Sequence, residues 1–267
     1  MSDGGEGALG ETPLVGGPAT IATAVAPRAT RPGPALIAAM LADRIAPGAG
    51  LTVLMTTSEA RADEIGRALA PMAEEDVEVL VLPPWDCLPY DHASPSRESQ
   101  GLRLAVLSRL GERSRRQVLV VSPEAAMLRL PPPEARSAAF VLKVGEALDR
   151  DALAAFARRT GYVFDDRIDE PGEIAILGEV VDVYPPASAA PVRIAFDEEG
   201  KVADIRRYDP VTQRSDDSVE RLCLTPASEL LIGPEDVRTP GEEHRMAERY
   251  SGGLESLLDL LSGCAER

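Results

Sequence analysis

The chain has 267 residues, 44% of them hydrophobic, which is enough for two ordinary domains with buried cores. It carries 28 Lys and Arg against 44 Asp and Glu, and this formal net charge of −16 repels a phosphate backbone, so direct DNA binding is expected to be weak or absent. The three cysteines are far apart and no CxxC is present, so the sequence predicts neither a disulfide framework nor a metal site, and no cofactor. No run approaches the roughly 20 apolar residues of a membrane span, and a cytoplasmic protein without a membrane partner is expected.

The first half of the chain predicts alternating helices and strands. Residues 1–30 are rich in Gly, Ala, Thr and Pro and predict a disordered leader. Strands are expected where short β-branched runs occur, and helices where apolar residues recur at helical spacing. The expected helices are 35–45, 58–69 (capped by Ser58), 99–110 and 123–130, and the expected strands are 51–55, 77–82 and 118–121. This alternation predicts a parallel sheet with helices on both faces, an α/β fold.

The second half predicts a small antiparallel sheet. After three prolines at 131–133 come a short strand at 140–142 and a helix from Asp149 to Thr160. Runs of about five apolar residues, each closed by Gly, Pro or Asp, then follow one another closely, as in β-hairpins. The expected strands are 174–177, 180–184, 192–196, 202–208 and 219–224, and helices are expected around 242–250 and 254–261.

Several motifs in this order resemble the bacterial transcription-repair coupling factor family (Mfd), and more distantly UvrB. They are LPPWDCLPYDHASPS (82–96), VVSPEAAMLRLPP (120–132), EPGEIAILGEVVDVYPPAS (170–188), PVRIAF (191–196), IRRYDPVTQRS (205–215) and LTPASE (224–229). The resemblance covers roughly residues 30–235. It implies a degenerate RecA-like domain at 31–132, an inserted UvrA-interaction-type α+β domain at 133–228, and a segment at 229–267 that returns to the first domain. In the resembling proteins that segment completes the first sheet, and this chain stops soon after the return begins.

Catalytic motifs are missing from this pattern. A phosphate-binding loop needs GxxxxGK followed by Ser or Thr, but the glycine-rich stretches at 14–25 and 31–40 contain no lysine. The one Gly-Lys pair, Gly200–Lys201, precedes a valine, and no DExH-type segment follows a strand. A nucleophilic pair of Cys87 and His92 is a minor alternative to a structural cysteine, and paired carboxylates such as Asp165–Asp166 are better explained as solvated turns. The sequence therefore predicts a chain that is not an enzyme.

Two features could contact nucleic acid, and each has a structural alternative. Arginines 103, 109, 113, 115 and 116 could form a basic patch, although the solvated side of a helix and its exit is the better explanation. Trp85 and Tyr90 could stack on bases, although packing at the sheet edge among prolines is favoured.

The resemblance implies a protein-binding surface on the small domain. The UvrA-binding arginine of the family matches Arg193, and the aromatic that follows it matches Phe196, whereas a second family arginine is replaced by Leu177. The family's second aromatic is likewise absent, with Asp197 in its place. Arg206, Arg207 and Arg214 could partly substitute, and the predicted partner-binding residues are Arg193, Phe196, Arg206 and Arg207.

Three functions are consistent with these observations. The first is a non-catalytic adaptor that binds UvrA in nucleotide excision repair. The second is a diverged regulatory or autoinhibitory module that contacts other domains of an Mfd-type DNA translocase and no longer binds UvrA. The third is a degenerate domain that binds ATP without hydrolysing it.

Overall fold

The computed structural model describes residues 32–45, 50–88, 91–110, 116–212, 214–251 and 253–265. The predicted leader at 1–30, the glycine-rich stretch at 14–25, Tyr90 and the arginines at 113 and 115 lie outside the described residues. The helices are α1 (Pro34–Ala42), α2 (Glu59–Leu69), α3 (Arg97–Arg109), α4 (Pro123–Met127), α5 (Pro133–Arg136), α6 (Arg150–Thr160), the 3₁₀ helix η1 (Glu242–Arg245), α7 (Met246–Arg249) and α8 (Leu257–Ala265). The strands are β1 (Leu51–Met55), β2 (Val77–Leu82), β3 (Arg116–Val121), β4 (Phe140–Lys143), β5 (Val163–Phe164), β6 (Glu173–Leu177), β7 (Val180–Val183), β8 (Val192–Phe196), β9 (Val202–Tyr208), β10 (Ser215–Ser218) and β11 (Arg221–Leu224).

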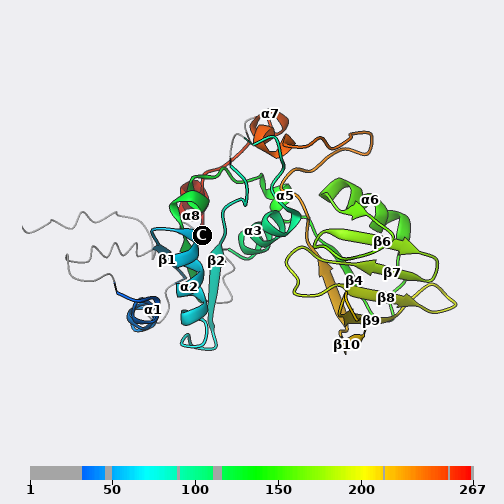
Figure 1. Ribbon diagram of the computed structural model, residues 1–267, viewed down its shortest axis with the longest axis horizontal. Helices are drawn as coiled ribbons and strands as arrows, with labels where there is room; N and C mark the ends of the chain where they lie inside the picture. Colours follow the sequence, from blue (N-terminus) through cyan, green and yellow to red (C-terminus); the bar gives the residue numbers. More distant parts are fainter. Residues whose placement is uncertain are drawn as a thin grey trace, which may run out of the picture.

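The first sheet is parallel and has the order β1-β3-β2 among the described residues (Figure 1). Its central strand β3 is fully apolar from Val118 to Val121 and buried on both faces, as expected of a strand covered by helices on two sides. One face packs against α1 and α2, through residues such as Val118 and Ile65. The other packs against α3, α4 and α8, through residues such as Leu119 and Leu107. The predicted α/β fold is confirmed.

Helix starts follow from capping side chains that the sequence shows directly. Ser58, Ser96, Ser122 and Asp149 each accept a hydrogen bond from a backbone N–H of the first turn, at the starts of α2, α3, α4 and α6. These bonds satisfy donors that a helix leaves unpaired at its start. Because the cap of α3 is Ser96, this helix begins two residues before its predicted start.

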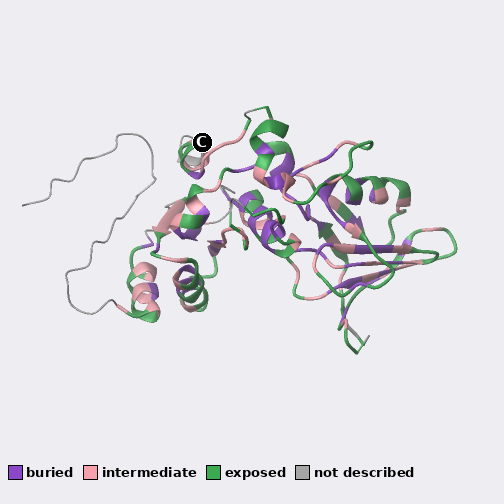
Figure 2. Cartoon of the chain, turned by 45° about the horizontal axis from the view of Figure 1, so that its top comes forward, coloured by how far each residue is buried: buried purple, intermediate pink, exposed green. Residues whose placement is uncertain are grey.

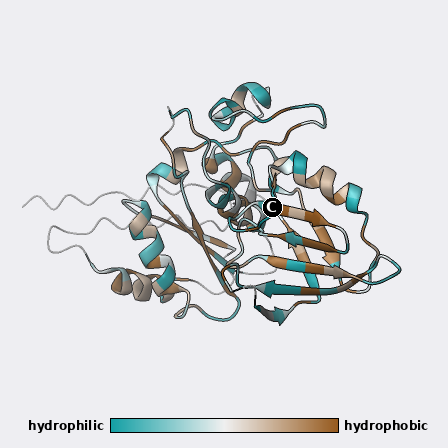
Figure 3. Cartoon of the chain, turned by 45° about the vertical axis from the view of Figure 1, so that its right-hand side comes forward, coloured by the Kyte–Doolittle hydropathy of each residue, from teal (hydrophilic) through white to brown (hydrophobic). Residues whose placement is uncertain are grey.

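Among the described residues the second sheet has six strands in the order β10-β9-β8-β7-β6-β5, antiparallel except for the β5–β6 pair. One face packs against α6 and against the two-stranded sheet β11-β4, around Ile194, Ile205, Leu153 and Leu142. Figure 2 shows buried segments running along the strands, and Figure 3 shows their hydrophobic residues in brown. The predicted strands form this α+β unit, but the last of them begins at Arg221 and belongs to the two-stranded sheet.

The tail after β11 packs against the first unit, whereas the resemblance implies that it completes the first sheet. Leu257, Leu260 and Leu261 of α8 pack in the same cluster as Leu119 and Leu130. Glu255 also forms an isolated β-bridge with Leu130. In the part of the chain that the structure describes, the tail therefore contributes a helix to the first unit and no strand to its parallel sheet.

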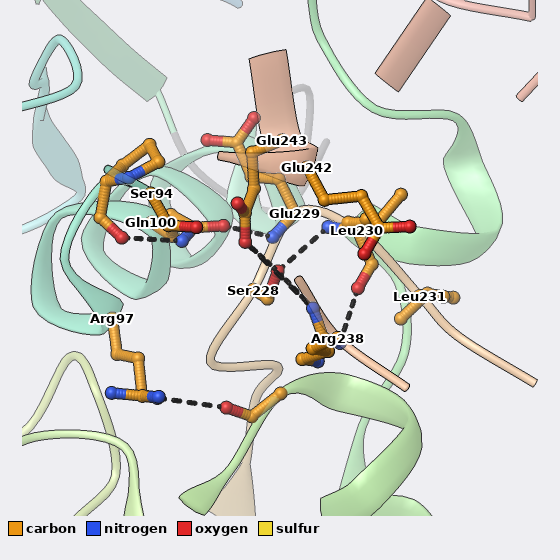
Figure 4. Close-up of polar contacts among 12 residues, drawn as sticks. Ser94, Arg97, Gln100, Ser228, Glu229, Leu230, Leu231, Arg238, Glu242 and Glu243 are labelled. Atoms are coloured by element: carbon orange, nitrogen blue, oxygen red, sulfur yellow. Dashed lines mark hydrogen bonds and ion pairs between the residues drawn. The ribbon is translucent and has the colours of Figure 1, made fainter. Parts of the chain in front are cut away.

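Helix α3 joins the two units and the tail. At Gly101 an added Cβ would lie 2.1 Å from the Cβ of Pro186 in the β7–β8 loop. The backbone of α3 therefore packs directly against Pro186, with no room for a side chain between them. Arg97 donates from Nε to the carbonyl of Gly161 at 3.1 Å, and the Gln100 side-chain oxygen accepts from the Glu229 backbone at 2.8 Å (Figure 4). These contacts fix the antiparallel sheet relative to the parallel one.

Candidate interaction surface

The antiparallel sheet has one face covered by α6 and an opposite face that is only partly exposed, with Tyr208 buried on it. Ile174, Val181, Ile194 and Ile205 are buried toward α6. Since side chains alternate along a strand, the residues between them lie on the opposite side, which we call the outer face. The outer face carries Leu177, Val180, Asp182, Arg193, Ala195, Asp204, Arg206 and Tyr208.

Arg193 is held in place on the outer face by its neighbours. It lies opposite Asp182 of β7, and its Nε and Nη2 donate to the two carboxylate oxygens at 2.8 and 2.7 Å. Its guanidinium also lies 5.1 Å from the ring centroid of Tyr208. The hydrogen bonds to Asp182 raise the pKa of Arg193, which therefore stays charged. Burial raises the pKa of Tyr208 to about 12, with Asp182 adding to the shift.

Arg206 lies directly opposite Arg193 in the β8–β9 register, so the two arginines share one face. Arg206 pairs with Asp204, whose other oxygen accepts a hydrogen bond from the Ser218 hydroxyl at 2.9 Å. The arginine side chains are 41% and 54% exposed, respectively. Each is thus preorganised by an aspartate that leaves part of its guanidinium accessible.

Phe196 and Arg207 lie on the other face of the sheet. Arg207 is opposite the buried Val192, and Phe196 packs against the core cluster. The guanidinium of Arg150, at the start of α6, covers the Phe196 ring at 4.2 Å from its centroid. The structure therefore brings together two of the four predicted partner-binding residues, Arg193 and Arg206, and separates them from Phe196 and Arg207.

Leu177 ends β6 on the outer face with 52% of its surface exposed. The two-residue turn Gly178-Glu179 follows, and Gly178 has φ of +48°, which suits glycine at the first central position of such a turn. Where the family has an arginine, this chain thus has an accessible apolar side chain beside a hairpin turn.

Sequence reasoning missed the roles of Asp182, Tyr208 and Arg150. The alternation in VVDVY places Asp182 between two buried valines and could have assigned it to the outer face. Its pairing with Arg193 depends on the β7–β8 register, and no pattern in the sequence connects Arg150 with Phe196.

The three described arginines of the candidate basic patch all pair with carboxylates. Arg103 is fully buried against Glu229, Arg109 pairs with Glu78, and Arg116 pairs with Glu74 and Asp76. The interpretation of Arg103 as part of a solvated helix face is wrong, because its partner comes from the tail 126 residues away.

Trp85 packs against the tail, whereas the sequence favours packing at the sheet edge. It is partly buried against Leu230, Ile232 and Met246, and its Nε1–H donates to Glu229 Oε1 at 3.0 Å. Its ring also meets His244 edge-on, with the ring centroids 5.5 Å apart. These contacts occupy the indole and leave the base-stacking interpretation without support.

Cys87 meets His244 rather than His92. Its Sγ lies 3.9 Å from His244 Nε2, which is also 3.0 Å from the carbonyl of Ala93. Burial raises the pKa of the Cys87 thiol, with further contributions from Asp86, Asp91 and Glu243, so the thiolate is disfavoured. This is the reverse of what a nucleophile requires.

A groove of about 760 Å³ lies at the joint, between the start of α3, Gly161 and the tail. Two arginines at its wall support the fold: Arg97 donates to Gly161, and Arg238 donates to the Ser228 hydroxyl and the Leu230 carbonyl (Figure 4).

Within the described ranges no group of three or more His, Cys, Asp and Glu side chains could hold a metal ion. No helix in this part of the chain is long and apolar enough to cross a bilayer.

Comparison with known proteins defines the class of the antiparallel unit. Residues 140–230, which run from β4 through the outer-face strands to the start of the tail, match the UvrB interaction domain family.

The resemblance to the transcription-repair coupling factors is also confirmed. The chain is 36% identical over 192 residues to the Transcription-repair-coupling factor of Bacillus subtilis, covering 70% of this chain and 15% of that protein. It is 35% identical over 171 residues to that of Myxococcus xanthus, and 27% identical over 256 residues to that of Mycobacterium bovis. These matches cover 64% and 91% of this chain, and 14% and 20% of the respective relatives. The chain thus spans a fifth or less of the length of these relatives.

Proposed function

We propose that this chain is a UvrB-homology module of the transcription-repair coupling type and acts as a non-catalytic adaptor that binds UvrA in transcription-coupled nucleotide excision repair. The units predicted from the sequence, 31–132, 133–228 and 229–267, are part of this proposal. The observation that carries it is the outer face within the matched region, where Arg193 and Arg206 stand side by side. Arginines held by aspartates suit a charged contact with an acidic protein surface, because their geometry is set before binding.

The direct test is calorimetric titration of the chain with UvrA from the same organism, at low and at physiological salt. Binding at micromolar concentration or tighter that weakens with salt is expected, since the contact is charged. Arg193→Ala should weaken it by at least about tenfold, as expected for a truncated charged contact. Arg221→Ala is the matched control: it removes the same charge from an exposed strand position in the two-stranded sheet. Absence of binding at tens of micromolar UvrA would contradict the proposal.

A second candidate is a regulatory or autoinhibitory module that contacts other domains of an Mfd-type translocase. Leu177 favours it, because an exposed leucine at this edge suits an apolar contact better than an acidic one. Binding to such a translocase without binding to UvrA, together with loss of that binding in Leu177→Arg, would support this candidate over the first.

A further inference from the structure

One arginine from outside the antiparallel sheet reaches the β6–β7 turn. Arg150 is the first residue of α6, whose N-cap Asp149 accepts a hydrogen bond from the backbone of Ala152 at 2.9 Å. Its Nη1 donates to the carbonyl of Gly178, and its guanidinium lies over the ring of Phe196. One contact from the β6–β7 turn and one from β8 therefore hold the guanidinium.

Arg150 differs from the arginines on the sheet, whose charges are compensated by aspartates. Arg193 pairs with Asp182, and Arg206 pairs with Asp204. Among the described residues, no carboxylate forms an ion pair with Arg150, and its Nε and Nη2 donate no hydrogen bond to a protein group. The Nε–Nη2 edge of a guanidinium is one of those that bind carboxylates in a bidentate manner.

Arg150 also lies close enough to the outer face to share a partner with it. Its guanidinium lies over Phe196 on the covered side of the sheet, and from there it reaches the β6–β7 turn at the end of the hairpin. Leu177 immediately precedes Gly178, the residue that Arg150 contacts. A protein surface that covers Arg193 and Leu177 thus comes within reach of the Arg150 guanidinium.

We propose that Arg150 is a further affinity-determining residue of the partner-binding surface, and that it donates hydrogen bonds to a carboxylate of the partner protein. Phe196 serves this contact as a positioning residue: its ring supports the guanidinium from the covered side of the sheet. This assignment rests on the proposed function, and it gives the predicted partner-binding residue Phe196 a role that does not require it to share the face of Arg193.

Arg150→Ala and Arg150→Gln test the assignment by calorimetry with UvrA. Glutamine removes the charge while keeping an amide N–H donor and an extended side chain at this position. Both variants are expected to weaken binding by about tenfold, and Phe196→Leu by less, because leucine fills the core site without supporting the guanidinium face. The loss should shrink at high salt, a dependence that a merely structural role would not produce.

Arg158→Ala is the matched control. Arg158 lies two turns along α6, and its guanidinium stacks over Phe164 at 4.9 Å in a similar way, but it is next to β5 rather than the β6–β7 turn. It should leave affinity within about twofold. If Arg150→Gln binds as tightly as wild type while Arg193→Ala does not, the assignment of Arg150 is wrong and the adaptor function stands. If the wild-type chain does not bind UvrA, the adaptor function fails, and the assignment of Arg150 fails with it.

Discussion

The guanidinium of Arg103 and the carboxylate of Glu229 meet at 2.6 Å with both side chains fully buried. Arg103 comes from α3 and Glu229 from the start of the tail, so this ion pair ties the tail to the helix that joins the two sheets. Arg103 also donates to the carbonyl of Pro83 at 2.8 Å, and the indole of Trp85 donates to the same Glu229 oxygen. The pair is thus the centre of a buried polar network.

Arg103→Ala should destabilise the protein strongly. Removing one partner leaves Glu229 as an uncompensated buried charge, which costs about 3 to 5 kcal/mol of unfolding free energy. Urea unfolding measures the loss, and the fluorescence of Trp85, the single tryptophan, reports on the same site. The double variant Arg103→Met with Glu229→Leu should recover part of that free energy. A loss below about 1 kcal/mol in Arg103→Ala would mean that the pair contributes as little as a surface ion pair.

Gly101→Ala should disturb the contact between α3 and the β7–β8 loop. Alanine normally stabilises a helix interior by about 0.5 to 1 kcal/mol relative to glycine. Here its Cβ would fall 2.1 Å from Pro186, so the loop must move, and overpacking of this kind costs about 1 to 3 kcal/mol. A lower melting temperature is therefore expected.

Gly263→Ala in α8 is the control for that substitution, because an added Cβ there meets nothing within 4 Å. It should be neutral or slightly stabilising. Equal melting temperatures for the two variants would show that the β7–β8 loop is not locked against α3.

Tyr208 should make stability depend on pH above about 10. Burial raises its pKa to about 12 in the folded protein, while in the unfolded chain the pKa is close to 10. The unfolded state therefore loses its proton first, so the stabilisation is complete below pH 10 and is lost as pH rises toward 12. Burial also raises the pKa of Tyr162, Tyr184 and Tyr250, so titration of tyrosinate absorbance should show several late-ionising tyrosines, of which Tyr208→Phe removes one. If the titration is unchanged in Tyr208→Phe, Tyr208 does not ionise in that range.

Local signals predicted most of the elements, and contacts distant in sequence account for the misses. β1, β2, β8 and β9 run over the residues expected, because β-branched runs end there at turn formers. β10 (Ser215–Ser218) is entirely polar and becomes a strand only by pairing with β9, so no pattern could predict it. The outer face shows the same limit. Alternation predicts that Arg193 points away from the core, but the β7–β8 register decides that Asp182 holds it.

Cys87 should react slowly with alkylating reagents. Its raised pKa, caused first by burial and then by the neighbouring carboxylates of Asp86, Asp91 and Glu243, lowers the fraction of thiolate, which is the reactive form. Cys223 is exposed on β11 and provides an internal reference. Iodoacetamide labelling at mildly alkaline pH, followed by peptide mass spectrometry, should therefore modify Cys223 well before Cys87. His244→Ala should not slow the reaction of Cys87 further, because His244 does not activate the thiol. The opposite result would be that Cys87 reacts faster than Cys223 and loses this advantage in His244→Ala. It would show that Cys87 is a nucleophile activated by His244, the role first considered for His92.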